Sequence, residues 1–239
     1  MAFVLTPWQA PPARPALAED EVHLWRFPLV YREHLQFLLD EQELQRARRL
    51  RVPRKAQAFI TARARLRQIL ARYLDQGPES LHFDYGAAGK PVLAGHLAGS
   101  PAFNLAHSGE WGLCALARGV AVGVDIERVD RSLDFAKLAA GFFSPAEHNR
   151  LQACTVLRRR RLFFRIWTRK EAWLKGRGSG FSDPDQDLGM VHLSASCTHD
   201  GKWWLRSLPV TRHYIAALAV PKEFACLRRW DGWPTAKAE

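Results

Sequence analysis

The sequence has few cysteines and no long apolar run, and both shortages exclude whole classes of protein. Its four cysteines, Cys114, Cys154, Cys197 and Cys226, stand far apart without C-x-x-C spacing, which argues against a zinc site or a disulfide framework. No apolar stretch approaches the roughly 20 residues that a membrane helix needs. Residues 1–14 also lack a basic region followed by an apolar core. We therefore expect a cytoplasmic protein with reduced thiols, no signal peptide and no membrane partner.

Acidic residues are also scarce relative to basic ones. The 239 residues include 24 Asp and Glu against 35 Lys and Arg, a formal net charge of +11. This excess favours an acidic partner, and nucleic acid, an acidic protein and a polyphosphate cofactor all remain open on charge alone. The length allows one large domain or two small ones with a sizeable core.

Residues 120–127 are predicted to form a buried strand that ends in two carboxylates. Side chains alternate between the faces of a strand, so the valines and Ile126 share one apolar face. Gly123, Asp125 and Glu127 share the other face with Ala121. Two carboxylates held this close repel each other unless a cation or a proton lies between them, and oxygen ligands favour Mg2+. A solvated acidic turn is the alternative.

Residues 163–175 have the apolar spacing of a helix, which Gly176 and Gly178 are expected to end. Glu171 and Lys175 are four residues apart and therefore share one face of this helix. One interpretation is an ordinary surface ion pair. In the other, Glu171 is a third carboxylate ligand for the Mg2+ ion and Lys175 contacts a phosphate.

Local patterns predict the remaining elements. Strands are expected at 21–27, 111–117, 202–208 and 213–220, a hairpin at 81–95, and helices at 33–50, from 54 to the Gly77-Pro78 pair and at 134–141. Ser144, Pro145 and Glu147 predict a helix that starts with a capping box. Residues 1–20 are expected to be an extended arm and 178–187 a loop.

Five motifs together resemble the 4'-phosphopantetheinyl transferases. G-V-D-I-E at 123–127 and W-T-R-K-E-A-W-L-K at 167–175 are similar to the two signature motifs of that family, and F-F-S-P-A-E-H at 142–148 matches the segment between them. G-K-P at 89–91 and F-N-L-A-H-S-G at 103–109 resemble coenzyme A contacts of the longer, surfactin-synthetase-activating subfamily. The motifs occur in family order over about residues 40–180.

The resemblance implies a fold and a reaction. The fold would be α+β, with two similar halves at 1–118 and 119–239 that form a pseudodimer with the active site in the cleft between them. The enzyme would be a cytoplasmic monomer that requires Mg2+. It would move the 4'-phosphopantetheine arm of coenzyme A to a serine of an acidic acyl or peptidyl carrier protein and release adenosine 3',5'-bisphosphate.

The resemblance also implies roles for individual residues. Metal ligands would be Asp125, Glu127 and Glu171. Catalysis would involve Glu171, Lys175 and Glu127, with Glu171 preferred as general base. Coenzyme A would be bound by Arg46, Lys90, Asn104, His107, Asp125 and Lys175. One departure is visible at Ala106, where many relatives have serine.

Two other functions remain open. A non-enzymatic nucleic-acid-binding protein would explain the net charge but leaves the three carboxylates without a purpose, because carboxylates repel phosphate in the absence of a metal. An inert coenzyme A-binding scaffold would not need to retain Asp125, Glu127 and Glu171, and all three are present. Both are weaker than the transferase. The basic run at 158–161 is either a solvated helix face or a docking surface for an acidic carrier protein.

Overall fold

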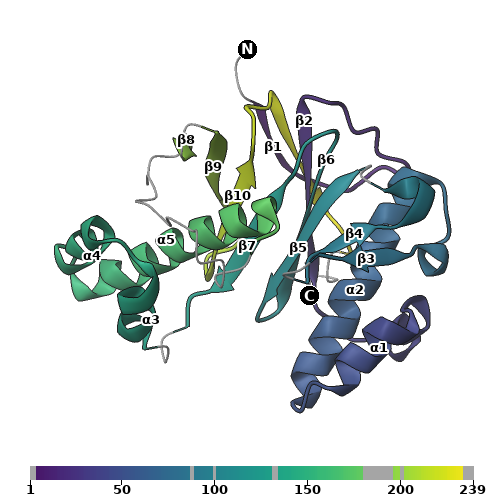
Figure 1. Cartoon of the computed structure of the whole chain (residues 1–239), viewed down its shortest axis with the longest axis horizontal. Coiled ribbons are helices and arrows are strands. Elements are labelled where there is room, and N and C mark those ends of the chain that lie inside the picture. Colours follow the sequence, from purple (N-terminus) through teal and green to yellow (C-terminus); the bar gives the residue numbers. More distant parts are fainter. Residues whose placement is uncertain are drawn as a thin grey trace, which may run out of the picture. The chain divides into compact units, whose positions relative to one another are not determined.

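The computed structural model describes residues 4–86, 89–98, 101–130, 134–179, 196–199 and 202–233. Contacts divide the chain into two compact units. Unit 1 comprises Met1–Gly119 and Phe224–Glu239, and unit 2 comprises Val120–Glu223. Each unit combines helices with a sheet (Figure 1), so the predicted mixed α+β fold is confirmed. None of the described helices is both long and apolar enough to cross a bilayer.

Unit 1 contains a sheet of five strands whose order is β1-β11-β2-β6-β5. The strands are β1 (Val4–Gln9), β2 (Glu21–Pro28), β5 (Ala102–Ser108), β6 (Trp111–Ala117) and β11 (Cys226–Asp231). β11 pairs in parallel with both β1 and β2, and the other pairs are antiparallel. The expected extended arm at 1–20 is therefore wrong for residues 4–9, which pair with β11 at the edge of the sheet. The sequence patterns did not predict β11.

The helices of unit 1 begin where local chemistry supplies a cap. A 3-10 helix, η1 (Glu33–Leu38), precedes α1 (Glu41–Arg48). The predicted single helix over 33–50 is wrong, because the Asp40 side chain accepts from the Glu43 backbone and Glu43 reciprocates, so a new helix starts there. α2 (Pro53–Leu74) begins with proline at its first turn and ends at Asp75, which has a left-handed backbone with φ of 54°.

The core of unit 1 lies between α2 and the sheet. Leu66, Ile69 and Leu70 of α2 are fully buried in one cluster with Trp25 and Phe27 of β2. The predicted hairpin forms from β3 (Phe83–Tyr85) and β4 (Pro91–Leu93), which pair antiparallel. Two short 3-10 helices flank it, η2 (Pro78–Ser80) and η3 (Gly95–Leu97).

Charged side chains are buried where α1 meets α2. Arg67 is 0% exposed and donates to Glu43 Oε2 at 2.8 Å and to the Leu81 carbonyl oxygen at 2.7 Å. Arg63 also pairs with Glu43, which is 1% exposed, while Asp40 accepts from Arg67 at 2.8 Å. Glu43 therefore neutralises two buried guanidinium groups and caps the helix that carries it.

Replacing Glu43 with alanine is expected to destabilise the protein by about 3–5 kcal/mol, because the buried Arg63 loses its carboxylate partner and the buried Arg67 is left with Asp40 alone. Glu41→Ala is the matched control on the same helix. Glu41 pairs with Arg48, but both side chains are more than 60% exposed, so its loss should cost less than about 1 kcal/mol. Urea unfolding midpoints of the two variants measure the difference. Equal midpoints would show that the buried cluster does not contribute.

Unit 2 contains a four-stranded antiparallel sheet and three helices. The sheet order is β7-β10-β9-β8, with β7 (Gly123–Arg128), β8 (Ser196–His199), β9 (Trp203–Leu208) and β10 (Tyr214–Val220). The helices are α3 (Phe135–Phe142), α4 (Pro145–Gln152) and α5 (Val156–Arg177). α5 packs on β7 and β10, as Figure 1 shows.

The caps of unit 2 largely follow the predictions. The capping box of Ser144 and Glu147 at the start of α4 is confirmed. α5 ends at Gly178, with φ of 75°, whereas Gly176 lies inside the helix and does not end it. β7 starts at Gly123, three residues later than expected. Most of the loop predicted at 178–187 lies outside the described residues.

Candidate functional site

Strand β7 and helix α5 come together without an intervening side chain at Gly123. Val124 and Ile126 are buried on one face of β7, as the alternation predicted. The other face packs against α5, and a Cβ placed on Gly123 would overlap the Ala172 carbonyl oxygen and the Gly176 nitrogen. The absence of a side chain lets the two backbones touch, and it holds the next residue on this face, Asp125, against the helix.

Three charged side chains meet at this contact. Lys175 Nζ lies 2.5 Å from Asp125 Oδ1 and 3.9 Å from Glu171 Oε2. Asp125 is 2% exposed, whereas the side chains of Glu171 and Lys175 keep 21% and 33% of their surface in solvent. The structure thus brings Asp125 to the Glu171–Lys175 pair that was predicted on one helix face. The site is anchored on the buried side and open on the other.

Burial and charge shift the pKa of each group. Burial raises the pKa of Asp125, although Lys175 acts in the opposite direction. Burial likewise raises the pKa of Glu171 to about 7, against the lowering effect of Lys175. Burial lowers the pKa of Lys175, but Asp125, Glu171 and Glu127 together outweigh it and the net shift is upward. The site therefore favours a cation among its carboxylates.

The carboxylates retain capacity for a further ligand. Asp125 Oδ2 is buried and has no hydrogen-bond partner among the described residues. Glu127 lies two residues further along the same face of β7 and is partly exposed. Oxygen donors of this kind suit a hard divalent cation. Among the described residues, no three His, Cys, Asp or Glu side chains are grouped closely enough to hold a metal, and the Lys175 ammonium lies between two of the expected ligands.

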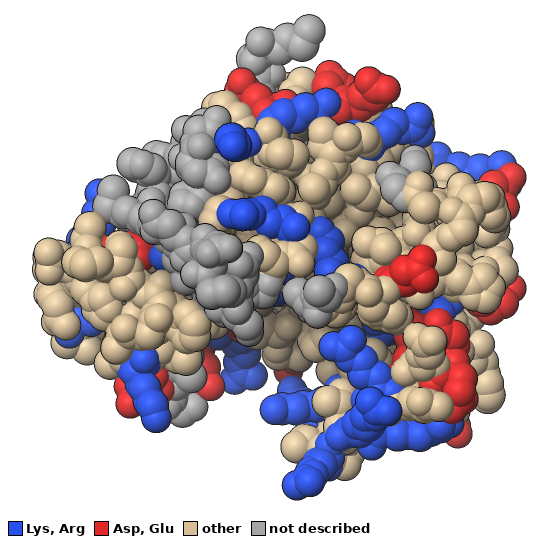
Figure 2. Space-filling view, viewed as in Figure 1, with Lys and Arg blue, Asp and Glu red and all other residues tan. Residues whose placement is uncertain are grey.

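Unit 1 carries the other predicted residues, and its basic side chains gather near α1. Figure 2 shows Lys and Arg concentrated at the lower right, where Figure 1 places α1 and the adjoining part of α2. Arg46 is exposed on α1 and lines a hollow of about 530 Å³ with Gln42, Gln45, Arg49 and Tyr85. This hollow can accept an anion.

The Gly89 turn lies beside this hollow. A Cβ built on Gly89, where φ is 73°, would lie 3.9 Å from Arg46 Nη1. Unit 1 thus brings Arg46 next to the turn that carries Lys90. Burial lowers the pKa of Lys90 to about 8. A lysine with this pKa is still largely protonated at neutral pH and can contact phosphate.

Asn104 and His107 lie on β5. Asn104 is 5% exposed, whereas His107 near the end of the strand is exposed to solvent. Ala106, the position noted as a departure from the family pattern, is 5% exposed and contributes to the apolar core. Asp125, Glu127, Glu171 and Lys175 all belong to unit 2.

One buried ion pair next to Glu171 was not predicted from the sequence. Lys170, which precedes Glu171, is 0% exposed, and its Nζ lies 3.0 Å from Oε2 of the equally buried Glu147. The pair ties the start of α4 to α5 beside the carboxylate site. The signal was present in the spacing, because Lys170 follows Phe163 by seven residues and Ile166 by four and so falls on the apolar stripe of the helix.

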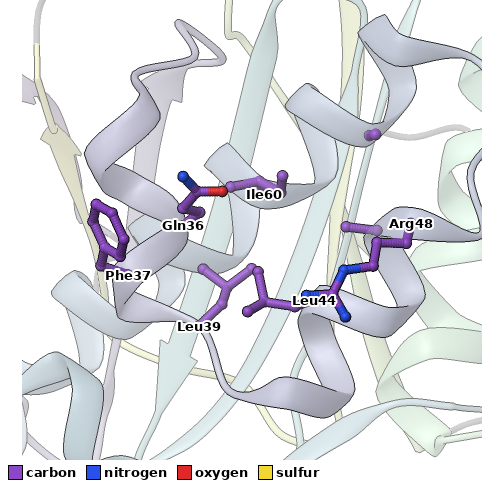
Figure 3. Close-up of a pocket in the computed structure, with 8 residues that line it drawn as sticks. Gln36, Phe37, Leu39, Leu44, Arg48 and Ile60 are labelled. Atoms are coloured by element: carbon purple, nitrogen blue, oxygen red, sulfur yellow. The ribbon is translucent and has the colours of Figure 1, made fainter.

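A separate hollow in unit 1 is mostly apolar. It measures about 550 Å³, and Figure 3 shows Leu39, Leu44 and Ile60 lining it beside Gln36 and Arg48. Phe37 at its edge is 75% exposed. The Arg48 guanidinium donates to Glu41 at 2.8 Å. This hollow has none of the predicted site residues.

Unit 2 thus places carboxylates around the Lys175 ammonium, and unit 1 contains a hollow that can accept an anion. Comparison with known proteins gives the family. The family model described as the 4'-phosphopantetheinyl transferase superfamily matches residues 121–227.

Three relatives have the same enzyme name. The chain is 36% identical over 224 residues to the 4'-phosphopantetheinyl transferase HetI of Nostoc sp. (strain PCC 7120), with 89% of this chain and 93% of HetI covered. It is 32% identical over 160 residues to psf-1 of Bacillus pumilus, covering 67% and 64%. It is 35% identical over 134 residues to AcpT of Escherichia coli (strain K12), covering 56% and 66%.

The chain therefore belongs to the 4'-phosphopantetheinyl transferase superfamily. The predicted class of enzyme, a phosphopantetheinyl transferase, is confirmed, and the alternative of a non-enzymatic nucleic-acid-binding protein is not favoured.

Proposed function

We propose that this protein transfers the 4'-phosphopantetheine arm of coenzyme A to a serine hydroxyl of an apo acyl or peptidyl carrier protein. The observation that carries the proposal is the partly buried cluster of Asp125, Glu171 and Lys175, formed by the two segments that resemble the family signatures. Family membership supports the same reaction. The released product is adenosine 3',5'-bisphosphate.

Mg2+ is the proposed cofactor, held by Asp125, Glu127 and Glu171. The orphaned, buried Asp125 Oδ2 supports this assignment, because a buried carboxylate oxygen without a donor is costly unless a cation is bound to it. When bound, the ion neutralises charge on the diphosphate as its P–O bond breaks.

The chain's own residues have distinct roles in the transfer. Glu171 is the proposed general base, because its carboxylate lies on the open side of the cluster, with 21% of the side chain exposed to an approaching serine. It takes the proton of the carrier serine as the serine oxygen bonds to the phosphorus of the pantetheine phosphate. The bond from that phosphorus to the bridging oxygen breaks. Glu127 shares this work, and Lys175 moves from Asp125 to the diphosphate.

Unit 1 provides the proposed contacts to the rest of coenzyme A. Arg46 and His107 hold the 3'-phosphate end, Lys90 contacts the diphosphate and Asn104 provides a further contact to coenzyme A. Two further proposals concern the subfamily of the enzyme and the arrangement of the two halves of its chain. We infer a cytoplasmic monomer of the surfactin-synthetase-activating type, a pseudodimer of two similar halves that divide near residue 119, with coenzyme A in the cleft between them. Residues 224–239, expected in the second half, belong to unit 1.

The intact mass of an apo carrier protein tests the reaction. Incubation with this protein, coenzyme A and Mg2+ should add one phosphopantetheine arm, and a chelator should abolish the gain, since the carboxylates would lose their ion. Adding Mg2+ in excess of the chelator should restore the mass gain. No mass gain with any of several carrier types would contradict the proposed function, and a gain that persists with chelator would contradict the metal.

A further inference from the structure

One side chain that lines the anion-accepting hollow of unit 1 was not among the predicted site residues. Tyr85 lines it from the end of β3, and the other lining residues that the structure describes, Gln42, Gln45, Arg46 and Arg49, come from α1 and its C-cap. These four are spaced i, i+3, i+4 and i+7, so they share one face of the helix. None of the described lining residues is acidic. The hollow thus combines two guanidinium groups, two amides and one phenol.

Tyr85 is fixed both through its backbone and through its side chain. Its backbone pairs with Pro91 across the hairpin, and the next residue, Gly86, donates to the Lys90 carbonyl oxygen at 3.0 Å. The guanidinium group of the buried Arg63 lies 5.7 Å from the Tyr85 ring centroid, and its Nη2 donates to the Tyr85 hydroxyl at 3.1 Å. The phenol is therefore held in place independently of a ligand.

The hydrogen bond from Arg63 determines what the Tyr85 hydroxyl can do. A guanidinium group has donors only, so the phenol oxygen must be the acceptor and its own proton is left for another group. Among the residues that the structure describes, none accepts that proton. A hydrogen bond received from a cation also polarises the hydroxyl and strengthens it as a donor. The Tyr85 hydroxyl is therefore a preset hydrogen-bond donor at the hollow.

The charges around Tyr85 leave this role to the phenol rather than to the arginine behind it. Arg63 is paired with the buried Glu43, which neutralises it. Burial raises the pKa of Tyr85, although Arg63 acts in the opposite direction, so the phenol keeps its proton at neutral pH. Arg46 and Arg49 are exposed and supply the positive charge of the hollow. Tyr85 adds a directed donor without adding charge.

We propose that Tyr85 donates a hydrogen bond to the 3'-phosphate of coenzyme A and makes the hollow selective for a phosphate monoester over a free hydroxyl. The inference rests on the proposed function, of which it uses only the binding of coenzyme A. A phosphate monoester has three terminal oxygens that accept hydrogen bonds, so it can take donors from α1 and from Tyr85 together. A ribose without this phosphate presents an uncharged hydroxyl and gains little from either. Tyr85 is a binding residue in this role, and Arg63 positions it.

Removal of a single hydroxyl group tests the proposal. Tyr85→Phe keeps the ring beside Arg63 and loses only the donor. Tyr31→Phe is the matched control, because Tyr31 is also partly buried in unit 1 but does not line the hollow. Isothermal titration calorimetry without a carrier protein gives the Kd of each variant for coenzyme A and for 3'-dephospho-coenzyme A. The transfer assay gives kcat and the KM for coenzyme A, and thermal unfolding checks the fold.

Tyr85→Phe should raise the Kd for coenzyme A about tenfold or more, the effect of losing one hydrogen bond to a charged group. The KM for coenzyme A should rise with it, while kcat, the melting temperature and the Kd for 3'-dephospho-coenzyme A stay unchanged. Tyr31→Phe should change none of these values. An unchanged Kd for coenzyme A would overturn the proposal. So would equal losses with the two ligands, because the hydroxyl would then contact a part of the cofactor that both share.

The binding and transfer measurements separate this inference from the proposed function. If the unmodified protein transfers nothing to any carrier protein but Tyr85→Phe selectively weakens coenzyme A binding, the proposed function fails and the inference stands. If the unmodified protein is active and Tyr85→Phe binds both ligands as tightly, only the inference fails. A protein that does not bind coenzyme A would overturn both.

Discussion

Asp125→Ala is expected to lower the rate of phosphopantetheine transfer by about a hundredfold to a thousandfold, the range for removing one transition-state electrostatic contact. Asp125 contacts Lys175 at 2.5 Å, and its second oxygen, which has no hydrogen-bond partner among the described residues, is the proposed metal contact, so the variant removes both interactions. Folding should change little. The substitution removes a buried carboxylate whose pKa burial raises, and Lys175 keeps Glu171 as a neighbour.

Two measurements on the same preparation check this prediction. Initial rates from intact mass report the loss of transfer activity, and a thermal unfolding curve reports whether folding is unchanged. Glu223→Ala, an exposed acidic position in unit 2, is the matched control and should keep full activity. Asp125→Asn separates charge from shape, because the amide keeps the volume but cannot neutralise a cation. A fully active Asp125→Ala protein would contradict the role given to this residue.

Gly123→Ala is expected to destabilise unit 2 by about 3 kcal/mol or more, at the upper end of the overpacking range. The added methyl group would overlap backbone atoms of Ala172 and Gly176, which cannot rotate away as a side chain would. α5 must move off β7, and the movement separates Asp125 from Lys175. Stability and transfer activity should therefore fall together.

Gly141→Ala provides the control within the same unit. A Cβ at Gly141 meets no atom within 4 Å, and the residue lies inside α3, where alanine favours the helix more than glycine does. That variant should be neutral or more stable by up to about 1 kcal/mol. Melting temperatures of both variants measure the contrast. An unchanged melting temperature for Gly123→Ala would show that the close contact is not required.

Local signals predicted the elements and caps of this protein well. Ser144 and Glu147 act within three residues of each other, so their capping box could be identified directly from sequence. The same logic applies to Asp40 and Glu43, and the missed break before α1 was therefore predictable. The Glu171–Lys175 pair followed from helical spacing alone.

Contacts between distant segments were less accessible. β1 and β11 are separated by more than two hundred residues, and no local pattern encodes that pairing. The approach of Asp125 to Lys175 depends on the backbone contact at Gly123, which the strand alternation could not specify. The partner of Lys170 was likewise unpredictable, although its position on an apolar stripe indicated burial.

The position of β11 has a consequence for the order in which the protein matures. β11 lies between β1 and β2, so the sheet of unit 1 is split until residues 226–231 have left the ribosome. Unit 2 is continuous from 120 to 223 and has all its strands earlier. Nascent chains usually fold from the N-terminus onward. In this protein unit 2 can fold first, and the sheet of unit 1 remains incomplete until β11 has been synthesised.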